Sequence, residues 1–164
     1  MNLKFKVTSN TKEWDKVKKR LLAANTASKI GVGWFNTGSH PNNRSSVPIA
    51  QIASWLETGT ERGSFIPPRP FIRSGFMYVI ANTPWFQTKL KKHMPMIADG
   101  KMTWTAFYKS IGPELEKLLQ LIMREWDVPG NAEATIALKG FDDPLFESGH
   151  LISQVEWKIL PKGA

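Results

Sequence analysis

The sequence contains no cysteine, and this absence excludes several classes of site. Disulfides, zinc sites with thiolate ligands, iron–sulfur clusters and cysteine nucleophiles all require the missing side chain. Small secreted scaffolds held together by disulfides are excluded for the same reason. The absence is compatible with a reducing compartment.

Long apolar runs are also missing. No stretch approaches the run of about 18 apolar residues that indicates a membrane-spanning helix. Residues 1–6 alternate between apolar and polar side chains, whereas a signal peptide has a continuous apolar stretch. We therefore expect a soluble protein with no membrane among its partners.

Acidic residues are few relative to basic ones. The 164 residues include 22 Lys and Arg against 14 Asp and Glu, which leaves a net charge of +8. Residues 1–29 hold eight of the bases and two of the acids, so most of the excess lies there. Such a region is typical of a solvated helix face, and it is also able to steer a chain toward nucleic acid or an acidic partner.

Helical spacing of apolar residues predicts most of the secondary structure. The basic segment 11–24 predicts an amphipathic helix with Trp14 on its apolar, packed side. The longest apolar stripe, 104–126, predicts a long helix with a kink at Pro113. Shorter helices are expected at 49–58, 71–78, 85–92 and 132–138, and Pro84 separates the middle two.

Alternating apolar and polar residues predict three short strands, at 3–7, 29–35 and 155–159. Two segments rich in turn formers, glycine and proline, 36–46 and 59–70, predict exposed loops. Together these elements predict a single α+β domain over 1–164, in which a small antiparallel β-sheet packs against long α-helices.

No constellation of residues predicts a reaction. The three histidines, His40, His93 and His150, lack the spacing of helix-borne metal ligands. Asp142 and Asp143 are adjacent, so in an extended segment they point to opposite sides and do not converge as a catalytic pair. The segment GVGW lacks the remainder of a phosphate-binding loop, and no serine occupies a nucleophile elbow. We therefore expect no catalytic, cofactor-binding or metal-binding residues.

Three segments carry a recognisable combination of motifs. They are IGVGWF at 30–35, VPIAQIASWLETGTERGSFIPPRPFIR at 47–73 and KGFDDPLFESGHLISQVEW at 139–157. The second segment is the most specific, because a short helix ending in Glu-x-Gly-Thr is followed by a variable loop and then by Ile-Pro-x-Arg-Pro-Phe. Its motif residues are Glu57, Gly59, Thr60, Ile66, Pro67, Arg69, Pro70 and Phe71.

Together these segments resemble the tail-completion, or neck, proteins of long-tailed double-stranded DNA bacteriophages, a family that includes minor tail proteins of the lambda Z type. The resemblance implies a structural virion protein at the head-proximal end of the tail, which completes the tail and prepares it for head–tail joining. It implies no enzymatic reaction and no cofactor.

The resemblance also implies partners and a location. The partners are other copies of the chain in a ring, with a hexamer as the first expectation, and the tail terminator, tail tube and connector proteins. The expected location is the tail or neck of the virion, and the host cytoplasm during assembly.

The resemblance places the expected contact residues in the second and third segments. Besides the motif residues of the second segment, they are Asp143, Pro144, Leu145 and Gly149. Phe65, with Ile66, is a further candidate for partner contact because both are apolar residues in an otherwise polar loop. For Arg69 two roles remain open. Its guanidinium either ties the loop to its own domain, for instance to Glu57, or contacts another subunit.

A second hypothesis is a nucleic-acid-binding module that uses the basic helix at 11–24. Its candidate contacts to DNA, or to an acidic partner, are Lys16, Lys19 and Arg20. DNA in the tail channel would be the corresponding ligand in a virion. This hypothesis predicts a salt-sensitive affinity for duplex DNA, whereas the assembly hypothesis predicts little DNA binding by the free protein.

Overall fold

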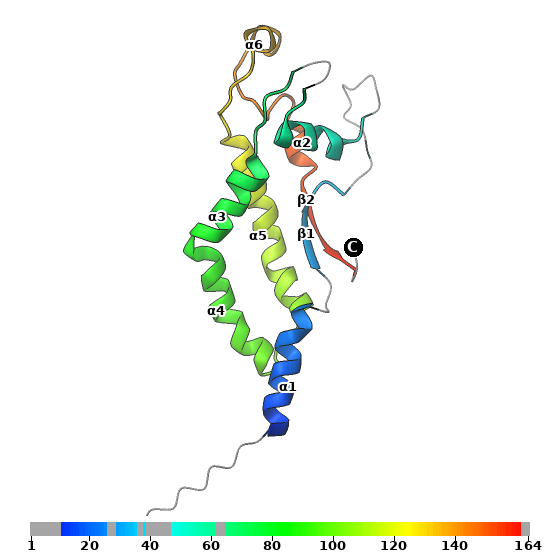
Figure 1. Cartoon of the computed structure of the whole chain (residues 1–164), viewed down its shortest axis with the longest axis vertical. Helices are drawn as coiled ribbons and strands as arrows, with labels where there is room; N and C mark the ends of the chain where they lie inside the picture. The colour runs from blue at the N-terminus through cyan, green and yellow to red at the C-terminus, as the bar shows by residue number, and fades with distance from the viewer. Residues whose placement is uncertain (1–10, 26–28, 36–37, 39–46, 62–64, 162–164) are drawn as a thin grey trace, which may run out of the picture.

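The computed structural model of the chain describes residues 11–25, 29–35, 38, 47–61 and 65–161. Within them, helices pack against one side of a small antiparallel sheet of two strands, so the predicted α+β class is confirmed (Figure 1). The predicted strand at the N-terminus and most of the first predicted loop lie outside the described residues.

Helix α5, Trp104–Arg124, is the long central element. The side chain of Thr103 caps it by accepting a hydrogen bond from the backbone N–H of Ala106 at 3.1 Å. The helix continues through Pro113, which lies on the exposed side. One face is buried along its whole length, as the apolar spacing predicted, and it contributes Phe107, Ile111, Leu115, Leu119 and Met123 to the core.

Strands β1, Lys29–Gly33, and β2, Glu156–Leu160, pair antiparallel, with the first residue of β1 opposite the last of β2. Both strands contact α5 (Figure 1). Trp157 of β2 lies so close to Gly112 of α5 that a Cβ atom at Gly112 would be 2.3 Å from the indole ring. The glycine in the middle of this helix is therefore explained by the close approach of the sheet.

Two consecutive helices, α3 (Met77–Asn82) and α4 (Pro84–Ala98), run beside α5 (Figure 1). Thr83 between them has an extended backbone and Pro84 occupies the first turn of α4, which confirms the predicted break. The chain enters α3 through a π-helical turn, η2 (Phe71–Phe76), whose first and last residues are buried in the core.

Helix α1, Thr11–Leu22, continues into a short 3₁₀ turn, η1 (Ala23–Asn25), and projects from one end of the molecule (Figure 1). It contacts α4, but none of its residues is fully buried. The prediction that Trp14 packs on an apolar face is wrong, because its side chain is 68% exposed. The helix extends past the end of α4, so the body of the protein covers only part of its apolar side (Figure 1).

Helices α2 (Ile49–Thr58) and α6 (Glu133–Lys139) lie at the opposite end of the molecule (Figure 1). Helix α2 buries Ile49 and Ala53 in the core. A short helix, α7 (His150–Ser153), precedes β2 and buries two of its four residues. These elements frame the candidate site.

Candidate functional site

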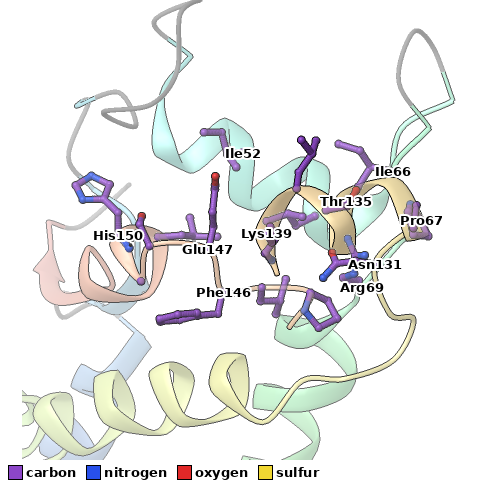
Figure 2. Close-up of a pocket in the computed structure, with 18 of the residues that line it drawn as sticks. Ile52, Ile66, Pro67, Arg69, Asn131, Thr135, Lys139, Phe146, Glu147 and His150 are labelled. Atoms are coloured by element: carbon purple, nitrogen blue, oxygen red, sulfur yellow. Dashed lines mark hydrogen bonds between the residues drawn. The ribbon is translucent and has the colours of Figure 1, made fainter. Parts of the chain in front are cut away.

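A groove of about 580 Å³ opens at the α2 and α6 end of the molecule (Figure 2). Helix α2 forms one wall, α6 another, and the turn that precedes α7 forms part of the lining. The lining is largely apolar and includes Ile52, Leu56, Phe65, Ile66, Pro67, Leu138, Pro144, Leu145 and Phe146. Its polar residues include Arg69, Asn131, Thr135, Lys139, Glu147 and His150.

Two of the three motif-bearing segments line this groove, and the first contacts one of the lining residues. Residues of the second and third segments line it together, although more than 60 positions separate them in the sequence. The first segment supports the lining from behind, because the indole N–H of Trp34 donates to the backbone carbonyl of Leu151 at 2.8 Å. The same indole packs edge-on against Phe71, with the ring centroids 6.1 Å apart.

Arg69 is the buried centre of this arrangement. Its Nε donates to the carbonyl oxygen of Pro129 and its Nη2 to that of Gly130, both at 2.9 Å. Only 4% of the residue is exposed, and burial lowers the pKa of the guanidinium, with the nearby charge of Asp142 acting in the opposite direction. The tie is therefore within the domain, as one of the two sequence interpretations held, but its partner is not Glu57.

Glu57 instead binds the start of the π-helical turn that follows the motif. Its carboxylate accepts hydrogen bonds from the backbone N–H groups of Ile72 at 2.8 Å and Arg73 at 3.1 Å. The side chain of Arg73 adds a third, ionic contact at 3.2 Å. A carboxylate at this position satisfies N–H groups that have no partner in the first turn of a helix. Sequence reasoning missed Arg73, because no spacing rule links positions 57 and 73.

Gly59 and Thr60 shape the loop between α2 and the proline-rich segment. Gly59 ends α2 with a φ of +76°, and a Cβ atom there would lie 2.8 Å from the carbonyl oxygen of Ile66. Thr60 forms an isolated bridge with Ile66, in which its N–H donates to the Ile66 carbonyl at 2.9 Å. The loop thereby presents Phe65, which is 75% exposed, at the edge of the groove.

The third segment forms a second closed turn on the other side of the groove. The backbone carbonyl of Asp143 accepts from the Lys139 ammonium at 2.6 Å, and its carboxylate accepts from the N–H of Phe146 at 3.1 Å. Pro144 and Leu145 are buried, and Gly149 has a left-handed backbone with a φ of +74°. These contacts place the predicted residues of the third segment in one wall.

Asp142 joins this turn to the segment that carries the carbonyl acceptors of Arg69. The carboxylate of Asp142 accepts from the backbone N–H of Asn131 at 2.8 Å and from its side-chain amide at 3.0 Å. Burial lowers the pKa of Lys139, and the neighbouring acids, Asp143 and Glu147 first, act in the opposite direction. The polar side chains at the base of the groove are thus held by contacts within the chain.

The predicted DNA-contact residues on α1 do not share one environment. Lys19 is exposed, and Lys16 is exposed but forms an ion pair with Glu13 at 2.6 Å. Arg20 turns toward the body, where its Nη1 donates to the carbonyl of Ala98 at 2.8 Å. Its own carbonyl accepts from the indole N–H of Trp104 at 3.0 Å. Arg20 therefore attaches α1 to the body and does not belong to its exposed basic face.

A further polar cluster joins α4 to α5, away from the groove. The carboxylate of Glu114 accepts hydrogen bonds from the Lys89 ammonium and from the Trp85 indole. The hydrogen bond from Lys89 is the main cause that lowers the pKa of Glu114, and that from Trp85 acts in the same direction. This cluster stabilises the packing of two helices and has no connection to the motif-bearing segments.

The described residues include no group of three or more histidine, aspartate or glutamate side chains arranged to hold a metal ion. None of the described helices combines the length and the apolar character that crossing a bilayer requires. The groove combines an apolar surface with a few charged and polar side chains, as surfaces that bind a protein partner often do.

Comparisons with known proteins returned no match: no protein-family model, no curated protein and no solved structure is significantly similar to the chain.

Proposed function

We propose that the chain is a structural virion protein that completes the head-proximal end of a phage tail and contributes to head–tail joining through protein–protein contacts in a ring. The motif resemblance described above suggests this role. The observation that supports it most is that the second and third motif-bearing segments, which are distant in the sequence, line one apolar groove, and that the first segment hydrogen-bonds to a residue of its lining.

The contacts of the motif residues are those of residues that hold the conformation of the chain. Glu57 and Arg69 are both buried and both bind backbone groups of their own chain. Phe65, which lines the same groove as Arg69, keeps its aromatic ring exposed. Aromatic side chains are enriched where protein partners bind.

In this proposal the partners are other copies of the chain, with six as the first expectation for the ring, and the tail terminator, tail tube and connector proteins. A ring suits a rotationally symmetric tube, because a heterologous contact closes when its rotation closes. The protein would reside in the neck of the virion after assembly in the host cytoplasm.

Interrupting the reading frame in a phage that carries it tests the proposal. We expect electron micrographs of lysates to show filled heads and separate tails, and purified protein added to such a lysate to restore joined particles. Joined, infectious particles that form without the protein would contradict the proposal. Phe65→Asp should restore joining poorly, whereas Met77→Asp, at another exposed apolar position, on α3, should restore it fully.

One observation favours a second candidate function, the binding of nucleic acid. Helix α1 exposes four lysines, Lys12, Lys16, Lys18 and Lys19. Gel shifts with duplex DNA at increasing salt test it, because an affinity that rests on phosphate contacts falls steeply as salt rises. Under this hypothesis the double substitution of Lys18 and Lys19 by glutamine lowers the affinity, and the matched substitution of Lys91 and Lys92 on α4 does not.

A further inference from the structure

Helix α1 carries two large apolar side chains, Trp14 and Leu22, that no other described part of the chain covers fully. Trp14 is the most exposed tryptophan described, and Leu22, two turns further on, is also exposed. Residues eight positions apart lie near the same face of a helix, and Lys18 lies between these two. Beside Leu22 the surface is hollowed, with Asp15, Lys18 and Lys19 in the lining of a recess of about 410 Å³.

The groove at the other end of the molecule offers a surface of the complementary kind. Its lining is apolar, with Ile52 and Leu56 of α2 on one side and α6 on the other. Leu138 of α6 is 90% exposed at its margin. A groove between two elements with exposed apolar side chains is a common site for an amphipathic helix.

The charges at the two ends have opposite signs. Helix α1 carries five bases and two acids, a net charge of +3. Residues 131–150, which supply α6 and the turn of the groove, carry four acids and one base, a net charge of −3. Glu133, Asp142 and Glu147 are exposed there. The cations of the groove face inward, because Arg69 is buried and the Lys139 ammonium binds a backbone carbonyl.

The two surfaces lie far apart on one molecule. Figure 1 shows α1 at one end of the long axis and α2 and α6 at the other. One copy therefore cannot bring its own α1 to its own groove without leaving the described structure. A contact between α1 of one copy and the groove of a second is heterologous, and such contacts build rings or open chains of subunits.

We infer that α1 of one copy docks in the groove of the next copy, with Trp14 and Leu22 on its apolar lining and the α1 lysines opposite the exposed acids. The occupant of the groove is thus a second copy of this chain. The inference rests on the proposed function only for the expectation that the series of copies closes into a ring.

Site-specific photocrosslinking tests the contact directly. A photoreactive benzoylphenylalanine at position 14 is placed in the full chain, and equal amounts of ¹⁴N and ¹⁵N protein are mixed at the highest soluble concentration. We expect crosslinked peptides that join position 14 to α2, to the loop at Phe65 or to α6, in mixed-isotope pairs. The absence of such pairs at these elements would overturn the inference.

Two substitutions at opposite ends test the same contact by sedimentation velocity. Trp14→Ala and Leu138→Asp each change an exposed side chain, so both variants should fold, as circular dichroism would verify. We expect each to weaken self-association by about tenfold or more, because a large aromatic anchor at the centre of a contact dominates its affinity. Met77→Ala, an exposed apolar position on α3, should associate like the wild type.

Mixing the two defective variants distinguishes a heterologous contact from other arrangements. Trp14→Ala keeps an intact groove and Leu138→Asp keeps an intact α1, so the mixture should form one-to-one pairs that grow no further. Unchanged association of either variant, or a mixture without such pairs, would overturn the inference. Loss of duplex DNA binding in Trp14→Ala without a change in self-association would assign α1 to nucleic acid instead.

The crosslinking and sedimentation experiments measure the association of the protein in solution, whereas the test of the proposed function measures the joining of heads and tails. Failure of the crosslink in a protein that still restores head–tail joining would refute the docking of α1 and leave the proposed function standing. Self-association through α1 and the groove, in a phage whose particles join without the protein, would do the reverse.

Discussion

The two ends of the molecule are built in different ways. At the groove end two charged side chains, Arg69 and Glu57, are buried, and each binds backbone groups outside its own element. At the other end no residue of α1 is fully buried, and Arg20 and Trp104 form hydrogen bonds between α1 and the body. The comparison shows that the motif residues fix the conformation of the groove end through buried hydrogen bonds, whereas α1 leaves the apolar side chains of Trp14 and Leu22 exposed.

Arg69→Met should produce the largest loss of stability. The substitution leaves the carbonyls of Pro129 and Gly130 without their donors, and each buried polar group left unsatisfied costs about 1–3 kcal/mol. We expect the free energy of unfolding in urea to fall by about 2–4 kcal/mol. Arg73→Met, whose side chain is 70% exposed, serves as the matched control and should cost less than about 1 kcal/mol. Equal losses in the two variants would contradict the role assigned to Arg69.

Two glycines with nearly the same φ, one toward each end of the molecule, allow the ends to be compared. Gly59 and Gly100 have φ values of +76° and +75°. A Cβ atom would meet the backbone of Ile66 at Gly59, but the far end of the long Arg20 side chain at Gly100. Gly59→Ala should therefore destabilise by about 2–3 kcal/mol, and Gly100→Ala by about 1 kcal/mol, the cost of the left-handed backbone alone. Thermal unfolding of the two variants would measure the difference, and the reverse order would break the comparison.

Acid should reveal a further difference between the body and α1. The folded state lowers the pKa of Glu114, so this carboxylate contributes stability above its unfolded pKa, which is lost as the pH falls through the folded value. Glu114→Gln should flatten that part of the stability profile by less than about 1 kcal/mol, because the side chain is partly exposed. Glu13→Gln on α1 removes an exposed carboxylate whose pKa is lowered by its hydrogen bond with Lys16, and it should change the profile less than Glu114→Gln, because solvent screens an exposed pair. Urea unfolding between neutral and acidic pH measures both.

Trp14→Ala should have the smallest effect on the stability of the isolated chain. Its side chain is largely exposed, so the free energy of unfolding should change by less than about 0.5 kcal/mol. Trp34→Phe is the matched change at the groove end, where the lost hydrogen bond to Leu151 should cost about 1 kcal/mol. A large loss of stability in Trp14→Ala would show that α1 is packed more firmly than the structure indicates.

Much of the architecture could be predicted from local patterns. The apolar stripe of α5, the end of α2 at Gly59, the break at Pro84 and the two described strands all follow from the spacing of apolar residues and from the backbone limits of glycine and proline. The position of Trp14 could not be predicted in this way. Helical spacing identifies an apolar face, but it does not show whether another element reaches far enough to cover it.

The same limit applies to the candidate site. Each motif residue could be identified from the sequence, but the groove that the second and third segments form together could not be predicted. Glu57 and Arg69 illustrate the reason, because the sequence suggested a bond between opposite charges 12 positions apart. The folded chain instead offers each of them backbone groups that point at the buried side chain.

The sequence by itself determined where most of the helices and the two described strands lie and which residues carry the charge, because these properties depend on neighbours within a few positions. It did not give the end of α4, which continues to Ala98, or helix α7. Only the tertiary structure decided which buried charge meets which carbonyl, which apolar residues gather into a groove and which remain in water. Those outcomes depend on contacts between residues far apart in the chain, and local physical rules set no preference among the available partners.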